Sequence, residues 1–116
     1  MREKIVLAFD VGTQSSRALL INNRGEILAK SQQQHKPPYV SPYPDWAERD
    51  ADLYFKDICT CSLDLKERFP DIFERIEAVS VTTIRDTVVC VDSSGKPLRP
   101  AILWLDKRMA EGRPQM

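Results

Sequence analysis

The spacing between the first two apolar segments restricts most strongly how this chain can fold. Residues 4–11, KIVLAFDV, are typical of a strand buried on both faces. A second strand-like segment covers residues 17–21. The eight residues from Asp10 to Arg17 are too few for a helical crossover, so the two strands must run antiparallel.

A turn and a third strand extend this hairpin. Residues 22–25, NNRG, supply turn chemistry in which Gly25 is able to adopt positive φ, and residues 26–33, EILAKSQQ, predict the next strand. Residues 35–50 then contain four prolines, which exclude a regular helix or a central strand. None of these prolines has P-x-x-P spacing, so we favour an ordered connector over a proline-rich recognition peptide.

A helix followed by a strand determines the expected topology. Residues 50–69 carry apolar side chains at positions 54, 58, 61, 65 and 69, with Asp50 available as N-cap and Pro70 just beyond the end. Residues 76–83 predict a strand, and residues 87–106 predict a hairpin turning at 93–96. A strand reached through a crossover helix normally returns parallel to its neighbour. If it lies beside the first strand, residues 10–17 and 82–86 meet at the sheet edge where α/β proteins bind ligands.

Composition limits the function classes. The chain has 116 residues, enough for one core, and its 17 basic and 17 acidic residues cancel. No global field therefore attracts nucleic acid or an anionic membrane, and the apolar runs are too short to span a bilayer. Three cysteines, an odd number, are expected to be reduced packing thiols. We expect a cytoplasmic protein without nucleic-acid or membrane partners.

The stretch between the first two strands has the chemistry of a phosphate-binding loop. Gly12 allows close backbone approach, so successive amide groups can point at one anion. Asp10 would repel phosphate unless a Mg²⁺ ion lay between them. Further donors are the side chains of Thr13, Ser15, Ser16 and Arg17. The alternative is an ordinary hairpin with an Asx turn.

Four segments stand in an order that is typical of one protein family: residues 10–17, 45–52, 78–86 and 95–108. The first of them, DVGTQSSR, resembles the D-x-G-T-x-S-x-R phosphate loop of the FGGY family of carbohydrate kinases, relatives of hexokinase and actin with a ribonuclease-H-like core. Residues 45–52, 78–86 and 95–108 resemble the segment before its first helix, its polyol-binding strand end and its hairpin ending in W-x-D-x-R. The resemblance implies that residues 1–116 are the N-terminal part of the first kinase domain, an incomplete α/β domain with a mixed sheet.

The resemblance also implies roles for individual residues. Asp10 would serve the Mg²⁺ of ATP, and Arg85 with Asp86 would match the Arg-Glu pair that glycerol kinases use on substrate hydroxyls. Asp86 is one methylene shorter than that Glu, and xylulose kinases carry a different pair, so the sugar or polyol stays open. Trp104 would line the substrate's carbon chain. The ATP phosphates would lie on Gly12, Thr13, Gln14, Ser15, Ser16 and Arg17.

Other positions are expected to have structural or no special roles. Asp106 and Arg108 match the family pattern and are predicted to be structural, and His35 is predicted to be a solvated loop residue. The family's general base lies beyond position 116, so the chain alone should have no useful turnover and should bind magnesium nucleotide weakly. Exposed apolar surface should favour self-association as a homo-oligomer.

Two other classes of function stay open at the level of sequence. A ribonuclease-H-like nuclease would place metal-binding carboxylates at the ends of the first and fourth strands, where Asp10 and Asp86 stand. The zero net charge and the elaborate phosphate loop argue against it. A non-catalytic binding module with the same fold is the other alternative.

Overall fold

A computed structural model describes residues 3–108 of the chain. The chain divides into two compact units, which are described separately below. Of the described residues, the first unit comprises 3–38 and 52–84, and the second comprises 39–51 and 85–108.

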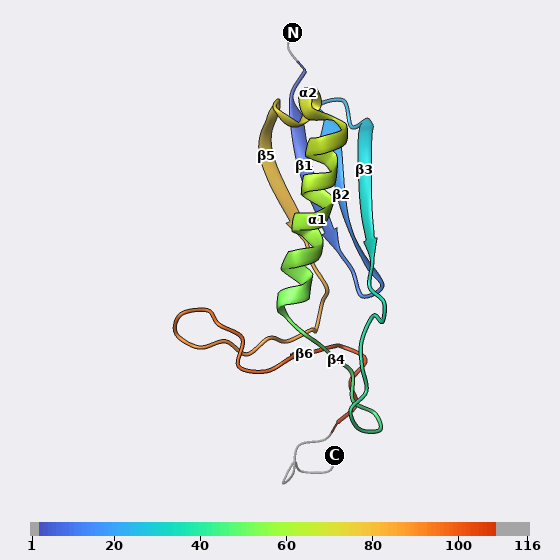
Figure 1. The fold of residues 1–116 in the computed structure, drawn as a ribbon, viewed down its shortest axis with the longest axis vertical. Coiled ribbons are helices and arrows are strands. Elements are labelled where there is room, and N and C mark those ends of the chain that lie inside the picture. Colours follow the sequence, from blue (N-terminus) through green and yellow to red (C-terminus); the bar gives the residue numbers. More distant parts are fainter. Residues whose placement is uncertain (1–2, 109–116) are drawn as a thin grey trace. The chain divides into compact units, whose positions relative to one another are not determined.

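A four-stranded mixed sheet forms the first unit. The strands β1 (Ile5–Val11), β2 (Ser15–Asn22) and β3 (Ile27–Gln34) pair antiparallel, and β5 (Ile76–Thr82) pairs parallel to β1. The order across the sheet is β3-β2-β1-β5 (Figure 1). The predicted meander and the parallel return strand are therefore confirmed, and Gly25 adopts the expected positive φ of 81° in the β2–β3 turn.

The crossover helix follows its prediction apart from its two ends. Helix α1 spans Asp52–Arg68, so it begins two residues after the predicted start, and it buries Cys61 and Leu65, which belong to the predicted apolar stripe. The chain then forms a second short helix, α2 (Pro70–Phe73), which was not predicted. Pro70 ends α1 but fits the first turn of α2, where its missing N–H costs nothing.

The core of the first unit lies between α1 and one face of the sheet. Its fully or nearly buried members are Ile5, Leu7, Ala18, Leu20, Ala29, Cys61 and Leu65. Helix α1 packs mainly against β2 and β3. The outermost strand β5 is therefore poorly covered, and Val79 and Val81 are 60% and 53% exposed. The expected exposure of apolar surface is confirmed at this strand.

The second unit contains little regular structure. Strands β4 (Glu48–Arg49) and β6 (Ala101–Ile102) pair antiparallel, and β4 is the only strand inside the proline-containing segment 35–50. Isolated bridges join Val88 to Ile102 and Val91 to Pro97, so the predicted hairpin exists in irregular form. Gly95, with φ of 84°, completes its turn.

An ion-pair network holds the second unit together. The Arg108 guanidinium donates to both carboxylate oxygens of Asp106, at 2.8 and 2.6 Å, and to Glu48 at 3.0 Å. The Asp106 carboxylate also accepts a hydrogen bond from the Ala47 N–H at 2.7 Å. The Cζ atom of Arg108 lies 3.7 Å from the centre of the Trp46 ring. These hydrogen bonds, those from Arg108 above all, hold the pKa of Asp106 well below its usual range and raise that of Arg108. The structural role predicted for Asp106 and Arg108 is confirmed.

Candidate functional site

The loop that joins β1 and β2 is a tight hairpin whose geometry favours glycine at residue 12. The Gly12 N–H donates to the Ser15 carbonyl at 2.9 Å. A Cβ atom on residue 12 would lie 3.0 Å from that same backbone oxygen. Such a contact is tighter than most Cβ contacts, so the loop favours glycine here, and its φ lies outside the left-handed region. That this glycine also lets the backbone approach an anion stays a prediction.

A polar row crosses the face of the sheet opposite α1, directly beside the loop. The strand registers align Thr82 with Asp10, Asp10 with Arg17, and Arg17 with Gln32. Arg17 forms an ion pair with Asp10, and both side chains stay more than a third exposed. The Ser15 hydroxyl lies on this face as well and accepts a hydrogen bond from Gln32 at 3.0 Å. An anion reaching this row would therefore meet a guanidinium and hydroxyl donors.

Ser16 departs from its predicted place among the phosphate donors. Alternate residues of a strand point to opposite faces, and Ser16 faces the core. It is fully buried, and its hydroxyl lies 3.0 Å from Nε2 of His35. Its carbonyl accepts the thiol of Cys61, whose pKa is raised chiefly by burial. The Ser16 side chain is thus not available to a solvent-exposed anion.

His35 was predicted to be solvated, and this is wrong. The residue is 3% exposed, and its backbone N–H donates to Gln14 O at 2.8 Å. Its ring nitrogens contact Thr13 O at 3.0 Å and the Asp57 carboxylate at 3.2 Å. The missed signal was period-two alternation, because His35 continues the core-facing series of β3 that includes Ala29 and Ser31.

The ends of β1 and β5 lie at one edge of the sheet, as predicted, because Asp10 pairs with Thr82. The candidate substrate residues follow in the second unit. Arg85 and Asp86 are exposed there, and Asp86 adopts a left-handed φ of 61°, which aspartate tolerates better than most residues. Trp104 is 54% exposed. That these residues face the loop stays a prediction.

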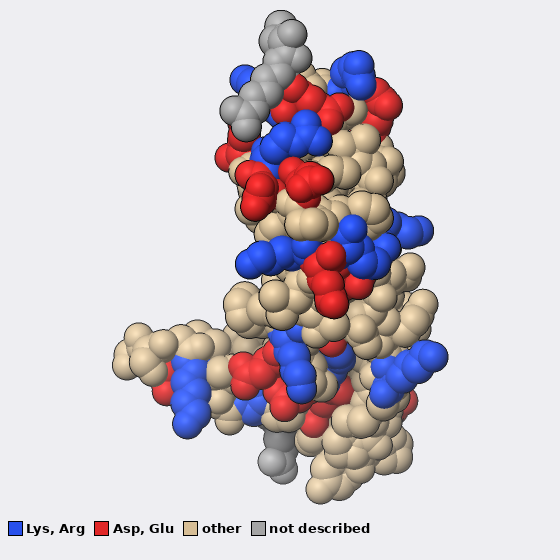
Figure 2. Space-filling view, turned by 45° about the horizontal axis from the view of Figure 1, so that its top comes forward, with Lys and Arg blue, Asp and Glu red and all other residues tan. Residues whose placement is uncertain are grey.

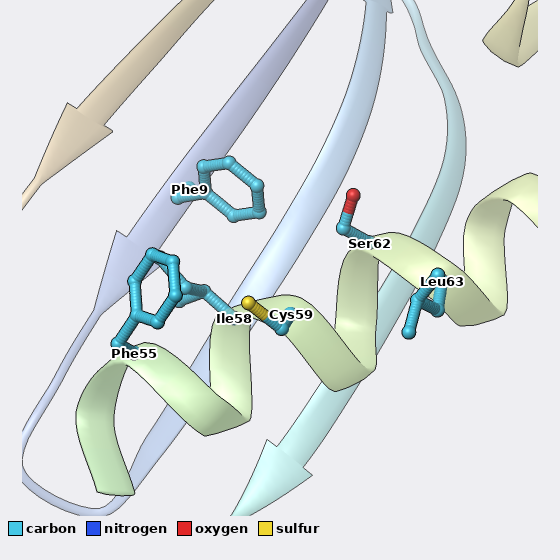
Figure 3. Close-up of a pocket in the computed structure, with 6 residues that line it drawn as sticks. All are labelled: Phe9, Phe55, Ile58, Cys59, Ser62 and Leu63. Atoms are coloured by element: carbon cyan, nitrogen blue, oxygen red, sulfur yellow. The ribbon is translucent and has the colours of Figure 1, made fainter. Parts of the chain in front are cut away.

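An apolar pocket of about 320 Å³ lies between α1 and β1 (Figure 3). Its lining consists of Phe9, Phe55, Ile58, Cys59, Ser62 and Leu63. Among the described residues no charged side chain lines it, so it offers phosphate no charged donor. We therefore place the candidate site at the β1–β2 loop and not in this pocket.

The described residues contain no cluster of three or more histidine, cysteine or acidic side chains suited to a metal ion. Asp10 is a single carboxylate, so a metal there would need most of its oxygen ligands from water and from phosphate. Within residues 3–108 no helix is long and apolar enough to cross a membrane. On the face shown in Figure 2, basic and acidic side chains are interspersed without a continuous patch of either sign. The cysteines are free.

Comparisons with known proteins find a matching family model and similar curated proteins. The family model described as "FGGY family of carbohydrate kinases, N-terminal domain" matches residues 5–114. A glycerol kinase of Oceanobacillus iheyensis is 35% identical over 113 residues, covering 97% of this chain and 22% of the relative. The chain thus spans about a fifth of the length of that relative.

Solved structures are similar over nearly the whole chain. The xylulose kinase from Rhodospirillum rubrum has a TM-score of 0.84 and 28% identity, with 93% of this chain and 22% of that chain covered. Plasmodium falciparum glycerol kinase, solved with ADP, has a TM-score of 0.82 and 26% identity, with coverage of 91% and 21%. The predicted ribonuclease-H-like, actin/hexokinase-type mixed sheet is confirmed.

Proposed function

Because this chain belongs to the FGGY family of carbohydrate kinases, we propose that the protein carrying it transfers the γ-phosphate of ATP to a hydroxyl of a sugar or polyol. The observation that carries the proposal is the β1–β2 loop at the carboxyl ends of β1 and β5, with Arg17 and Ser15 on one exposed face beside it. Phosphoryl transfer needs mainly that the reacting groups are positioned and that the negative charge of the phosphates is neutralised. The hydrogen-bond donors of this loop serve both needs.

In the proposed complex the loop holds the terminal phosphates of ATP. Thr13 and Ser15 contribute hydroxyl groups, and Gln14 contributes its backbone N–H. Arg17 contributes positive charge, and it reaches phosphate by exchanging its contact with Asp10 for one with the nucleotide. Gly12, which has no Cβ atom, lets the backbone lie close to the Ser15 carbonyl, so that the loop stays tight.

Asp10 is proposed to serve the Mg²⁺ that accompanies ATP. The carboxylate is 36% exposed and is released from charge pairing when Arg17 turns to phosphate. A lone carboxylate suits Mg²⁺, which keeps several water ligands and takes others from phosphate. When bound, the ion neutralises charge on the nucleotide.

The acceptor is proposed to be bound through Arg85, Asp86 and Trp104. A carboxylate accepts hydrogen bonds from two adjacent hydroxyls while a guanidinium donates to their oxygens, which suits a polyol chain. The general base is not among these residues. Asp86 is proposed to orient hydroxyls, so residues 1–116 on their own should give no useful turnover. No observation favours the nuclease alternative.

A coupled assay of ADP release tests the proposal. The full-length protein that carries this chain should release ADP only when a sugar or polyol is present, at rates of order one per second or more. Arg17→Met should weaken MgATP binding, whereas Asp86→Ala should raise KM for the acceptor. Acceptor-independent ADP release, or no release with any member of a panel of polyols and ketoses, would refute the function.

A further inference from the structure

We propose that His35 is a positioning residue of the β1–β2 loop, which it holds so that successive backbone amides face the phosphates. The inference rests on the proposed function, since the anion is the phosphate chain of ATP. His35 would thus affect nucleotide binding although it is buried and lies 19 positions beyond Ser16 in the sequence.

Two hydrogen bonds connect His35 to consecutive carbonyls of the loop. Its backbone N–H donates to Gln14 O at 2.8 Å, and Nδ1 lies 3.0 Å from Thr13 O. A carbonyl oxygen only accepts, so Nδ1 carries the proton in this contact. Both carbonyls are therefore turned toward the end of β3.

Because the peptide bond is planar, the direction of these two carbonyls also fixes the direction of the N–H groups that follow them. In a trans peptide the C=O of one residue points opposite to the N–H of the next. With Thr13 O and Gln14 O directed at His35, the N–H groups of Gln14 and Ser15 point away from it. The Gln14 N–H donates to no backbone acceptor among residues 3–108. Successive amides with this common direction form the type of concavity that binds phosphate.

The imidazole is itself held in one orientation. Its side chain is fully buried, and Nε2 lies 3.0 Å from the Ser16 hydroxyl and 3.2 Å from the Asp57 carboxylate of α1. The ring of Tyr54 packs against it edge-on, with 5.8 Å between centroids. Another rotamer of the imidazole would break at least one of these contacts, because both ring nitrogens are engaged. Through His35 the loop is therefore connected to α1 as well as to β3.

Two near-isosteric substitutions separate the two ring nitrogens. In His35→Asn the side-chain amide nitrogen replaces Nδ1 and keeps the donor to Thr13 O. In His35→Gln it replaces Nε2 and keeps the contacts with Ser16 and Asp57 but loses that donor. The two variants should be destabilised alike, because each loses one side of a buried ring. Only the Gln variant should release the loop.

The measurement is the dissociation constant of MgATP by calorimetry without acceptor, together with KM for ATP and for acceptor, in the full-length protein that carries this chain. We expect His35→Gln to weaken MgATP binding about tenfold, His35→Asn by less than about threefold, and neither to change KM for the acceptor. Leu65→Ala is the matched control. It removes buried volume from α1 one turn beyond Cys61 and should lower the melting temperature without changing MgATP affinity.

Equal MgATP affinities for the Asn and Gln variants would overturn the inference, as would an unchanged affinity in both. A parallel rise in the acceptor KM would do the same, because it would indicate general disruption. A wild-type protein that binds no MgATP would instead refute the proposed function, and the role of His35 would fall with it. The two failures are therefore distinguished by the wild-type titration alone.

Discussion

Replacement of Arg108 by Met tests the ion-pair network of the second unit most directly. The Asp106 side chain is 2% exposed, and it accepts two hydrogen bonds from the Arg108 guanidinium. Hydrogen bonds to charged groups contribute about 1.5–3 kcal/mol each. Removal of one partner from a buried pair costs about 3–5 kcal/mol, since the other charge stays buried. We expect the Arg108→Met variant to lose stability in that range.

A double-mutant cycle isolates the interaction. Asp106→Asn keeps an acceptor for the Ala47 N–H and leaves Arg108 paired with Glu48, so it should cost only about 2 kcal/mol. When both changes are combined, no buried charge is left at position 106. The free energy of unfolding of the double variant should therefore fall by clearly less than the sum of the decreases in the two single variants.

Urea unfolding of the 116-residue chain, followed by tryptophan fluorescence, supplies the assay. Both tryptophans of the chain, Trp46 and Trp104, belong to the second unit, and the Arg108 guanidinium stacks on Trp46. The control is Lys107→Met, an exposed position that should change stability by less than about 0.5 kcal/mol. Single-variant losses that add within about 0.5 kcal/mol in the double variant would show that the two residues do not act as a pair.

Three further predictions follow from single features of the structure. The pKa of Asp106 is depressed in the folded state, so the stabilisation by its carboxylate is present above the unfolded value of about 3.9 and is lost progressively as pH falls from there through the folded value. The urea midpoints of the wild type and Asp106→Asn should therefore approach each other as pH falls below about 4. A gap that stays constant would contradict this. Gly12→Ala should weaken MgATP binding in the full-length protein, because the new methyl meets Ser15 O at 3.0 Å, and unchanged calorimetric affinity would show that the loop adapts freely. The double variant Val79→Thr/Val81→Thr should self-associate less than the wild-type 116-residue chain, because both valines expose apolar surface on β5. Light scattering at several protein concentrations measures this. Equal association of the variant would show that the contact lies elsewhere.

Much of the fold could be predicted from local features because these features depend on chain length and periodicity alone. The short connection between residues 10 and 17 permits only a hairpin, and the 4-3-4-4 spacing from Tyr54 to Phe69 permits only one buried helical stripe. The choice of Asp10, Arg17 and Ser15 as candidate site residues has the same origin, since alternate strand positions keep them on one face. That they bind the nucleotide stays a prediction.

Only the tertiary structure decided which polar residues are buried and what they contact. Ser16 and His35 are polar residues of polar segments, and period-two alternation indicates only which neighbours share their face of the sheet. They are buried because α1 covers that face and brings Asp57 to the imidazole. Likewise, the pairing of Asp106 with the Ala47 amide joins segments that are 59 residues apart. Sequence patterns specify which side chains share a face, whereas the partners of a buried polar group are set by the packing of distant elements, because such a group must find its hydrogen bonds wherever the fold places them.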